Sequence, residues 1–209
     1  MTRRIVLATR NPDKLTELAR ILAASGTAVS LAGLDEFPGA PEVAETGRTF
    51  AENALLKARS AASYTGLAAV ADDSGLCVDA LNGMPGVLSA RWAGGHGDDQ
   101  ANLDLVLGQL TDVAAADRGA HFACAAAIVV PAGAAGRPAI ERVVEGRLHG
   151  RLAPAPRGTN GFGYDPIFVP DSSELTTAEM EPAAKDAISH RGRALRALAP
   201  VISDLLGAS

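Results

Sequence analysis

Apolar positions along the chain alternate between short continuous runs and longer stretches in which they recur every three or four residues. Residues 5–8 form a short, partly β-branched apolar run, which predicts a buried strand. Asn11 and Pro12 then suit the N-cap and the first position of a helix. That helix is expected to end near Gly26, and its apolar face consists of Leu15, Leu18, Ile21 and Leu22.

The next stretch, residues 27–47, is rich in glycine and proline and predicts a loop. Thr49 and Glu52 follow it with the spacing of a capping box, in which each side chain accepts a backbone N–H of the other residue. They predict the start of a helix that runs to about Tyr64.

The remaining elements follow the same two periodicities. Strands are predicted at residues 67–71, 122–130, 140–149 and 167–169, and amphipathic helices around residues 103–110 and from about Glu174 onward. The first of these strands is expected to end on Asp72-Asp73-Ser74-Gly75. The Pro131–Pro138 segment suits a hairpin link, and Pro200 is expected to kink or restart the last helix.

Early alternation of strands and helices, followed by a hairpin, predicts an α/β fold with a mixed sheet and flanking helices. The length of 209 residues fits a single domain, residues 1–209, made of two lobes. We expect the active-site cleft to lie between the lobes.

Composition narrows the classes of protein. The net charge of −5 argues against a nucleic-acid binder, which normally presents a basic face. No apolar stretch approaches the length of a membrane span, and the first residues lack a signal-peptide core. Cys77 and Cys124 lie in apolar runs without metal-ligand spacing, which suits core residues in a reducing compartment. These features predict a cytoplasmic protein.

The first candidate for chemistry is the turn between the first strand and helix: Thr9, Arg10, Asn11, Pro12, Asp13 and Lys14. A helix N-terminus presents unpaired N–H groups to anions. Lys14 opposes the helix dipole there, and a bound anion would relieve that conflict. The turn therefore predicts a phosphate cradle, with an ordinary capped loop as the alternative.

The second candidate is an acidic cluster: Glu45, Glu52, Asp72 and Asp73. Ligands of open α/β sheets lie beyond the carboxyl ends of strands, which is where the Asp pair is expected. Mg²⁺ prefers carboxylate oxygens and substrate phosphates, so the cluster indicates a magnesium site. Turn formation by the Asp pair is the alternative, and Glu52 is in part structural as the capping-box acid. Lys57 and Asn53, on one helix face, either pair locally or reach a phosphate.

The third candidate is Thr159-Asn-Gly-Phe-Gly-Tyr-Asp-Pro166. Its glycines, among them Gly163, allow close backbone approach and expose an aromatic ring. An exposed Phe162 or Tyr164 would stack on a base, and Asp165 would accept hydrogen bonds from it. The alternative is a tight loop that leads into a strand.

The fourth candidate is Ser189-His-Arg-Gly-Arg193, with Lys185 four residues before it. Arg191 or Lys185 would donate to a carbonyl oxygen of a base, whereas His190 suits a cap or a packing position. A merely solvated basic turn is the alternative.

The order of these motifs resembles the inosine triphosphate pyrophosphatase family, whose members act on altered purine nucleoside triphosphates. The matching segments are Thr9-x-Asn-x-x-Lys14, Glu45-Thr-Gly-x-Thr-Phe-x-Glu-Asn-Ala54, Ala71-Asp-Asp-Ser-Gly-Leu76, Pro85-Gly86, Ser89-Ala-Arg91, Gly161-Phe-Gly-Tyr-Asp-Pro166 and Ser189-His-Arg191. The resemblance spans about residues 5–195. Arg10 and Asn160 are mild departures from the family pattern.

The resemblance implies an elongated two-lobed fold around a long mixed sheet, a homodimer, a Mg²⁺ requirement, and hydrolysis of ITP, dITP and XTP to monophosphate and pyrophosphate. The residues that it implies for the phosphates are Thr9, Asn11, Lys14 and Lys57, with Ser74 also touching substrate. It implies Asp73 as the general base, and Glu45 with Asp72 or Asp73 at the metal. For the base pocket it implies Phe162, Tyr164, Asp165, Lys185, His190 and Arg191.

Three other functions compete with this interpretation. A pyrophosphatase for other altered nucleotides, such as methylated pyrimidines, would share the phosphate chemistry but not the base pocket. A nucleotide-binding sensor without catalysis would not need the acidic cluster, and a dimerisation module would need none of these loops.

Overall fold

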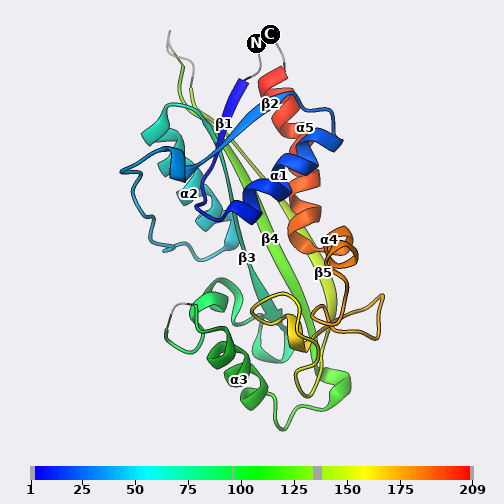
Figure 1. Cartoon of the computed structure of the whole chain (residues 1–209). Helices are drawn as coiled ribbons and strands as arrows, with labels where there is room; N and C mark the ends of the chain where they lie inside the picture. Colours follow the sequence, from blue (N-terminus) through cyan, green and yellow to red (C-terminus); the bar gives the residue numbers. More distant parts are fainter. Residues whose placement is uncertain (1–2, 96, 134–137, 208–209) are drawn as a thin grey trace. The chain divides into compact units, whose positions relative to one another are not determined.

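The computed structural model describes residues 3–95, 97–133 and 138–207, and the side chains of Asp13 and Gly207 lie outside that description. The strands are β1 (Arg3–Leu7), β2 (Val29–Gly33), β3 (Ala68–Val78), β4 (Gly119–Val130), β5 (Ile140–Leu152) and β6 (Phe168–Pro170). The helices are α1 (Pro12–Ala24), α2 (Phe50–Thr65), α3 (Asp99–Gln109), α4 (Pro182–Ile188) and α5 (His190–Gly207) (Figure 1). None of these described helices is long and apolar enough to cross a membrane.

The strands form one sheet in the order β2-β1-β3-β4-β5-β6. β1 pairs in parallel with both β2 and β3, whereas β5 and β6 are antiparallel. The α/β fold with a mixed sheet and flanking helices is thereby confirmed.

The chain divides into two compact units. The first contains residues 1–73, 124–146 and 191–209, and the second contains residues 74–123 and 147–190. The boundary falls within β3, β4 and β5 and at the start of α5. The cleft that we expect between two lobes stays a prediction.

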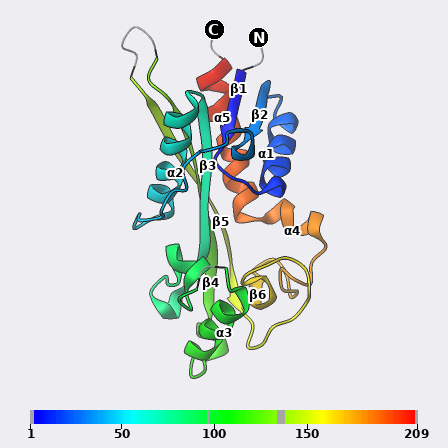
Figure 2. The same cartoon turned by 60° about the vertical axis from the view of Figure 1, so that its left-hand side comes forward.

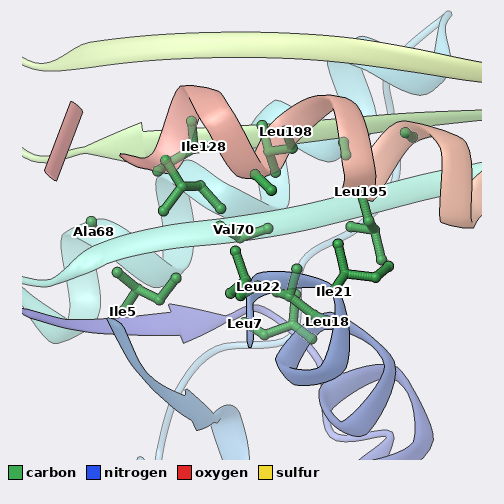
Figure 3. Packing of buried hydrophobic residues seen from close by; sticks show 14 of the residues in the cluster. Ile5, Leu7, Leu18, Ile21, Leu22, Ala68, Val70, Ile128, Leu195 and Leu198 are labelled. Atoms are coloured by element: carbon green, nitrogen blue, oxygen red, sulfur yellow. The ribbon is translucent and has the colours of Figure 1, made fainter. Parts of the chain in front are cut away.

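In the first unit, strand side chains alternate between two apolar layers because successive residues of a strand point to opposite faces. Val70 of β3 packs with Leu18 of α1 and Leu195 of α5 on one face (Figure 3). Ala69 and Ala71 pack on the other face, with the alanines of α2. Helices α1 and α5 therefore cover one face of this part of the sheet and α2 covers the other (Figure 2).

The second unit has its own core. Leu103 and Val106 of α3 pack against Leu76 of β3. Phe122 and Phe168 add a tilted aromatic pair whose ring centroids lie 4.6 Å apart. This core supports the loop of residues 154–167.

The capping box that begins α2 is confirmed. Thr49 Oγ1 accepts the backbone N–H of Glu52 at 3.1 Å, and the Glu52 carboxylate accepts the N–H of Thr49 at 3.2 Å. Gly66, in the left-handed conformation, ends the helix.

Three local predictions are wrong, and a fourth is wrong in part. Residues 27–47 are not all loop, because Val29–Gly33 pairs with β1 as strand β2. β3 does not end at Asp72-Asp73 but continues to Val78. The last helical region begins at Pro182 rather than Glu174. The backbone before Pro182 forms hydrogen bonds with other segments instead of helical ones; for example, the Thr177 N–H donates to the Phe168 carbonyl at 2.9 Å. Of the kink or restart expected at Pro200, the restart is not found, since α5 continues through this residue.

The Pro131–Pro138 hairpin link is not tested, because residues 134–137 lie outside the described residues.

Candidate active site

Asp72 and Asp73 lie inside β3, so their side chains point to opposite faces of the strand. Asp72 shares its face with α1 and α5, and Asp73 shares its face with α2. Both side chains are almost fully buried. The adjacent acids therefore belong to two separate clusters in the first unit, which differs from the shared acidic site expected at a strand end.

The Asp73 carboxylate is held by two residues one helical turn apart on α2. Asn53 Nδ2 donates to Asp73 Oδ2 at 3.0 Å, and Lys57 Nζ donates to Asp73 Oδ1 at 3.5 Å. Lys57 Nζ also donates to Glu45 Oε1 at 2.8 Å. Asn53 is fully buried, and its Oδ1 accepts the backbone N–H of Gly47 at 2.7 Å, which ties the loop carrying Glu45 to the same helix.

The electrostatic environment of Asp73 suits a general base. Burial raises the pKa of Asp73 and outweighs the opposing effects of the Lys57 charge and the Asn53 hydrogen bond. Burial by itself would lower the pKa of Lys57. The Asp73 charge and the hydrogen bond to Glu45 together outweigh that effect, so the pKa of Lys57 lies above its usual value. A carboxylate with a raised pKa that is still paired with a cation is a common feature of catalytic sites.

Glu45 and Asp73 are the carboxylates that fit a magnesium ion. Both contact Lys57, and Mg²⁺ is commonly bound by one or two carboxylates together with substrate phosphates. Within the described residues, no group of three or more His, Cys, Asp or Glu side chains is arranged to hold a metal. Asp72 lies on the other face of β3 and does not join this pair.

The Asp72 cluster joins α1 to α5. Lys14 Nζ donates to Asp72 Oδ2 at 2.8 Å, and Arg191 Nε donates to the same oxygen at 3.2 Å. Arg191 also forms an ion pair with Glu17, one turn after Lys14 on α1. Burial lowers the pKa of Arg191 to about 10, which leaves it charged at neutral pH between two carboxylates.

Asp72 is therefore the anion that relieves the unfavourable position of Lys14 at the helix N-terminus. The turn before α1 is ordered by a short-range contact, in which the Asn11 N–H donates to Thr9 Oγ1 at 3.1 Å. Arg10 donates to the carbonyl of Ala40 at 3.0 Å. The side chain of Asp13 lies outside the described residues, and Pro12 begins α1 on the surface.

Glu52 has a structural position. Its carboxylate accepts the backbone N–H groups of Arg48 and Thr49 at 2.5 and 3.2 Å. These contacts account for the acid of the capping box.

The second unit carries a separate cluster around the buried Asp165. Lys185 forms a close ion pair with Asp165 Oδ2, which also accepts the N–H of Phe162 at 2.9 Å. Thr177 Oγ1 donates to Asp165 Oδ1 at 2.8 Å. Both carboxylate oxygens of Asp165 thus accept hydrogen bonds from within the protein. Asp165 therefore stabilises the loop and positions Lys185, whereas the sequence predicts it as a hydrogen-bond acceptor for a nucleobase.

Phe162 is the aromatic residue that this loop exposes. Its side chain is flanked by Gly161 and Gly163, both with positive φ, and the residue is 77% exposed. Lys185 Nζ lies 5.3 Å from the ring centroid. An exposed ring beside an ammonium group presents both a stacking surface and a hydrogen-bond donor.

The exposed ring expected at Tyr164 is not found, which corrects that prediction. Tyr164 is buried, its hydroxyl donates to the Ser89 carbonyl at 2.8 Å, and burial raises its pKa. Ser89 Oγ in turn accepts the Leu76 N–H at 2.9 Å, and a Cβ at Gly75 would collide with it. These contacts give the Ser89 and Gly75 motifs a packing explanation, and Ser74 beside them is only partly buried.

His190 is stacked on Phe122, with ring centroids 4.8 Å apart and planes at 13°. This supports the packing position considered for His190 from the sequence.

Sequence reasoning missed one residue of these clusters and the partner of another. Glu17 is not among the sequence candidates, although its three-residue spacing from Lys14 places both on one helix face. For Asn53 the sequence offers local pairing or a phosphate contact, whereas its amide donates to Asp73. Its partner lies in another element, and local periodicity carries no information about that contact.

Comparison with known proteins places the chain in a family. The model of the Ham1 family matches residues 5–201. A dITP/XTP pyrophosphatase of Streptomyces coelicolor is 61% identical over 98% of this chain and 99% of its own length. A solved structure of the dITP/XTP pyrophosphatase of Mycobacterium abscessus is 56% identical, with a TM-score of 0.79, over 95% of this chain and 99% of that chain.

A HAM1 protein from Coxiella burnetii is 42% identical, with a TM-score of 0.86, over 97% of this chain and 100% of that chain. The six-stranded mixed sheet with its flanking helices defines an α/β protein. The chain belongs to the Ham1 family, and the resemblance inferred from the order of its motifs is confirmed.

Proposed function

We propose that this protein hydrolyses ITP, dITP and XTP to the nucleoside monophosphate and pyrophosphate, and so removes altered purine nucleotides from the nucleotide pool. The names of the Streptomyces and Mycobacterium relatives support this substrate class. The observation that carries the chemistry is the Asp73 carboxylate, which is buried, bound by Asn53 and Lys57, and raised in pKa.

In the proposed reaction Asp73 accepts a proton from a water molecule. The water oxygen forms a bond to the α-phosphorus, the bridging P–O bond breaks, and its electron pair leaves with pyrophosphate. A general base of raised pKa is effective because it combines sufficient basicity with a substantial ionised fraction near neutral pH. Lys14 and Lys57 contribute positive charge that offsets the phosphate charges, since electrostatics and positioning dominate phosphoryl transfer.

Glu45, with Asp73 beside it, would hold Mg²⁺. When bound, the ion would polarise a phosphoryl oxygen and lower the pKa of a nearby water. Two carboxylates around Lys57 suit such an ion because phosphates complete its coordination. Thr9 and Asn11 remain proposed phosphate contacts, and Ser74 remains a proposed substrate contact.

For base selection we propose Phe162 as the stacking surface and Lys185 as a donor to the 6-oxo group of hypoxanthine or xanthine. Adenine presents an amino group at that position, so donor would face donor. Sites that pair with such a group can discriminate by about 10⁴–10⁵-fold. Arg191 is the second proposed donor, although it is bound to Asp72 and Glu17 here.

The test is pyrophosphate release from ITP, XTP, ATP and GTP, with Mg²⁺ and with EDTA. Fast, Mg²⁺-dependent release from ITP and XTP alone is expected. Release of inorganic phosphate would move the attack to another phosphorus atom, and a Lys185→Met variant with an unchanged ITP to ATP ratio would remove Lys185 from base selection.

A homodimer is a further part of the proposal and rests on the family resemblance; sedimentation velocity of the full chain tests it. A reducing, cytoplasmic location is favoured by the two buried free cysteines.

A further inference from the structure

The loop that exposes Phe162 is held by two carboxylates from different segments of the second unit. The Phe162 N–H donates to Asp165 Oδ2 at 2.9 Å, within the loop itself. The next N–H, that of Gly163, donates to Asp99 Oδ2 at 2.8 Å. Asp99 is the first residue of α3 and lies 64 positions earlier in the chain. The Cα atom that carries the Phe162 ring therefore lies between two N–H groups that are bound to carboxylates.

The local sequence alone leaves the direction of the Phe162 ring open. Gly161 and Gly163 flank it with φ of +78° and +61°, and glycine has the widest choice of backbone conformations of any residue. The ring is also exposed, so packing does little to hold it. Its direction therefore depends on the hydrogen bonds that hold the backbone on either side of it.

The two aspartates at the start of α3 have different partners. Asp98 is the N-cap, and its Oδ1 accepts the N–H of Ala101 at 3.0 Å. Asp99 favours the helix through its negative charge in the first turn, yet its carboxylate binds the N–H of Gly163 in another segment. The cap of the helix is thus supplied by Asp98, and the bond to Gly163 is an additional role of Asp99.

The opposite side of the Phe162 ring is tied to Lys185 through a shared acceptor. Asp165 Oδ2 binds both the Phe162 N–H and the Lys185 ammonium group, and Lys185 Nζ lies 5.3 Å from the centroid of the ring. The bond to Asp99 fixes the backbone that follows the ring. The ring and the ammonium group are therefore held together as one preformed surface.

We propose that Asp99 is a positioning residue for the purine base: by binding the Gly163 N–H, it holds the Phe162 ring in the orientation that stacks on the base. The inference rests on the proposed function, in which Phe162 stacks on the base, and adds a residue that lies outside every sequence motif considered above. Asp99 acts through the backbone of Gly163. A surface that is already ordered loses less conformational freedom when the ligand binds, which strengthens binding.

The test separates the base from the phosphates. It uses the full chain with Mg²⁺ and two probes, IMP and inorganic tripolyphosphate, measured by calorimetry. Asp99→Ala is expected to weaken IMP binding about two- to tenfold, because one hydrogen bond that orders the loop is lost. Tripolyphosphate has no base, so its affinity should stay within about twofold of the wild type. For ITP, KM should rise while kcat is maintained, as expected for a loss of binding that is uniform along the reaction.

Two matched variants separate the hydrogen bond from the charge of Asp99. Asp99→Asn removes the charge at the start of α3 but keeps an oxygen that can accept the Gly163 N–H, so IMP affinity should stay within about twofold of the wild type. Asp104→Ala removes another exposed acid of the same helix, which accepts a hydrogen bond from Gln100 at 2.8 Å. It should leave IMP affinity unchanged. A loss in Asp99→Asn equal to that in Asp99→Ala would assign the effect to charge and overturn the proposal.

A double-mutant cycle tests whether Asp99 acts through the ring. Phe162→Ala is expected to weaken IMP binding about five- to 150-fold, the usual contribution of one stacked base. Adding Asp99→Ala to that variant should weaken binding by no more than about twofold further, because no ring is left to position. Two losses that multiply independently would overturn the proposal.

Hydrogen exchange of the Gly163 amide, followed by NMR without ligand, tests the contact itself. Exchange is expected to be about two- to tenfold faster in Asp99→Ala than in the wild type and unchanged in Asp104→Ala. Equal rates in Asp99→Ala and the wild type would overturn the proposal, as would a wild type that does not bind IMP. A wild type that binds IMP but releases no pyrophosphate from ITP would overturn the proposed function and leave the positioning role of Asp99 in place.

Discussion

Asp72 and Asp73 are neighbours in the sequence but bind cations on opposite faces of β3: Asp72 pairs with Lys14 and Arg191, and Asp73 pairs with Lys57. The separation follows from the alternation of side chains along a strand. It allows Asp72 to link α1 to α5, while Asp73 and Glu45 share Lys57 as a partner. The two carboxylates therefore have different expected roles, and substitution can distinguish them.

Asp73→Asn is expected to reduce kcat for ITP by about 10²–10⁴-fold, the usual contribution of a general base. The amide has nearly the same volume, so the fold should persist. Steady-state pyrophosphate release measures the effect, and near-wild-type turnover would remove Asp73 from the mechanism.

The same variant has a predicted effect on stability. The raised pKa of Asp73 means that ionising it in the folded protein costs free energy. That cost is present above the folded pKa and disappears as the pH falls below the unfolded pKa. Asp73→Asn should therefore unfold at a higher temperature than the wild type at neutral pH, and the difference should shrink at acidic pH; a difference that grows on acidification would contradict this.

Asn53→Ala is expected to shift the acidic limb of the kcat/KM profile to higher pH. The Asn53 hydrogen bond lowers the pKa of Asp73, so its removal raises that pKa further. Stability should also fall by about 1–3 kcal/mol, because the partly buried Gly47 N–H loses its acceptor.

Asn102→Ala is the matched control for this experiment. Asn102 is also buried, and its Oδ1 accepts the N–H of Ala93 at 2.7 Å in the second unit. It should lower stability by a comparable amount and leave the pH profile unchanged. Equal shifts of the profile in the two variants would show that the effect is not specific to Asp73.

Gly161→Ala is expected to destabilise the loop around Asp165. Gly161 has φ of +78°, and a Cβ there would collide with the Asp165 carboxylate and lie 3.0 Å from Lys185 Nζ. The combined steric and backbone cost is about 2–5 kcal/mol. Gly163→Ala, at φ of +61° with open space around the Cβ, should cost only about 1–2 kcal/mol. Thermal unfolding and the KM for ITP compare the two, and equal losses would exclude the Asp165 collision.

Arg191→Met is expected to lower stability by about 3–5 kcal/mol, because Asp72 and Glu17 would be left as uncompensated carboxylates in a largely buried setting. Arg151→Met is the control, since its partner Glu174 is 91% exposed and such pairs contribute about 0–1 kcal/mol. Urea unfolding measures both. The ITP to ATP ratio of the Arg191 variant tests, in the same protein, whether this side chain also selects the base.

The sequence by itself determined the family, the order of the motifs, the α/β class and the capping box of α2. These features depend on residue identity and on periodicities of two or 3.6 residues, which are local properties of the chain. The exposed Phe162 between glycines could also be predicted, because glycine at positive φ is a local requirement.

Tertiary structure decided which residues act together. β3 continues through Asp72 and Asp73 because it lies between β1 and β4 in the sheet, and this places the two acids on opposite faces. The buried Tyr164 donates its hydroxyl hydrogen bond to the carbonyl of Ser89, which lies 75 positions away in the sequence. Arg191 binds Glu17, which is 174 positions away. Such contacts depend on how strands and helices pack in three dimensions, and that packing is not encoded in any short stretch of residues.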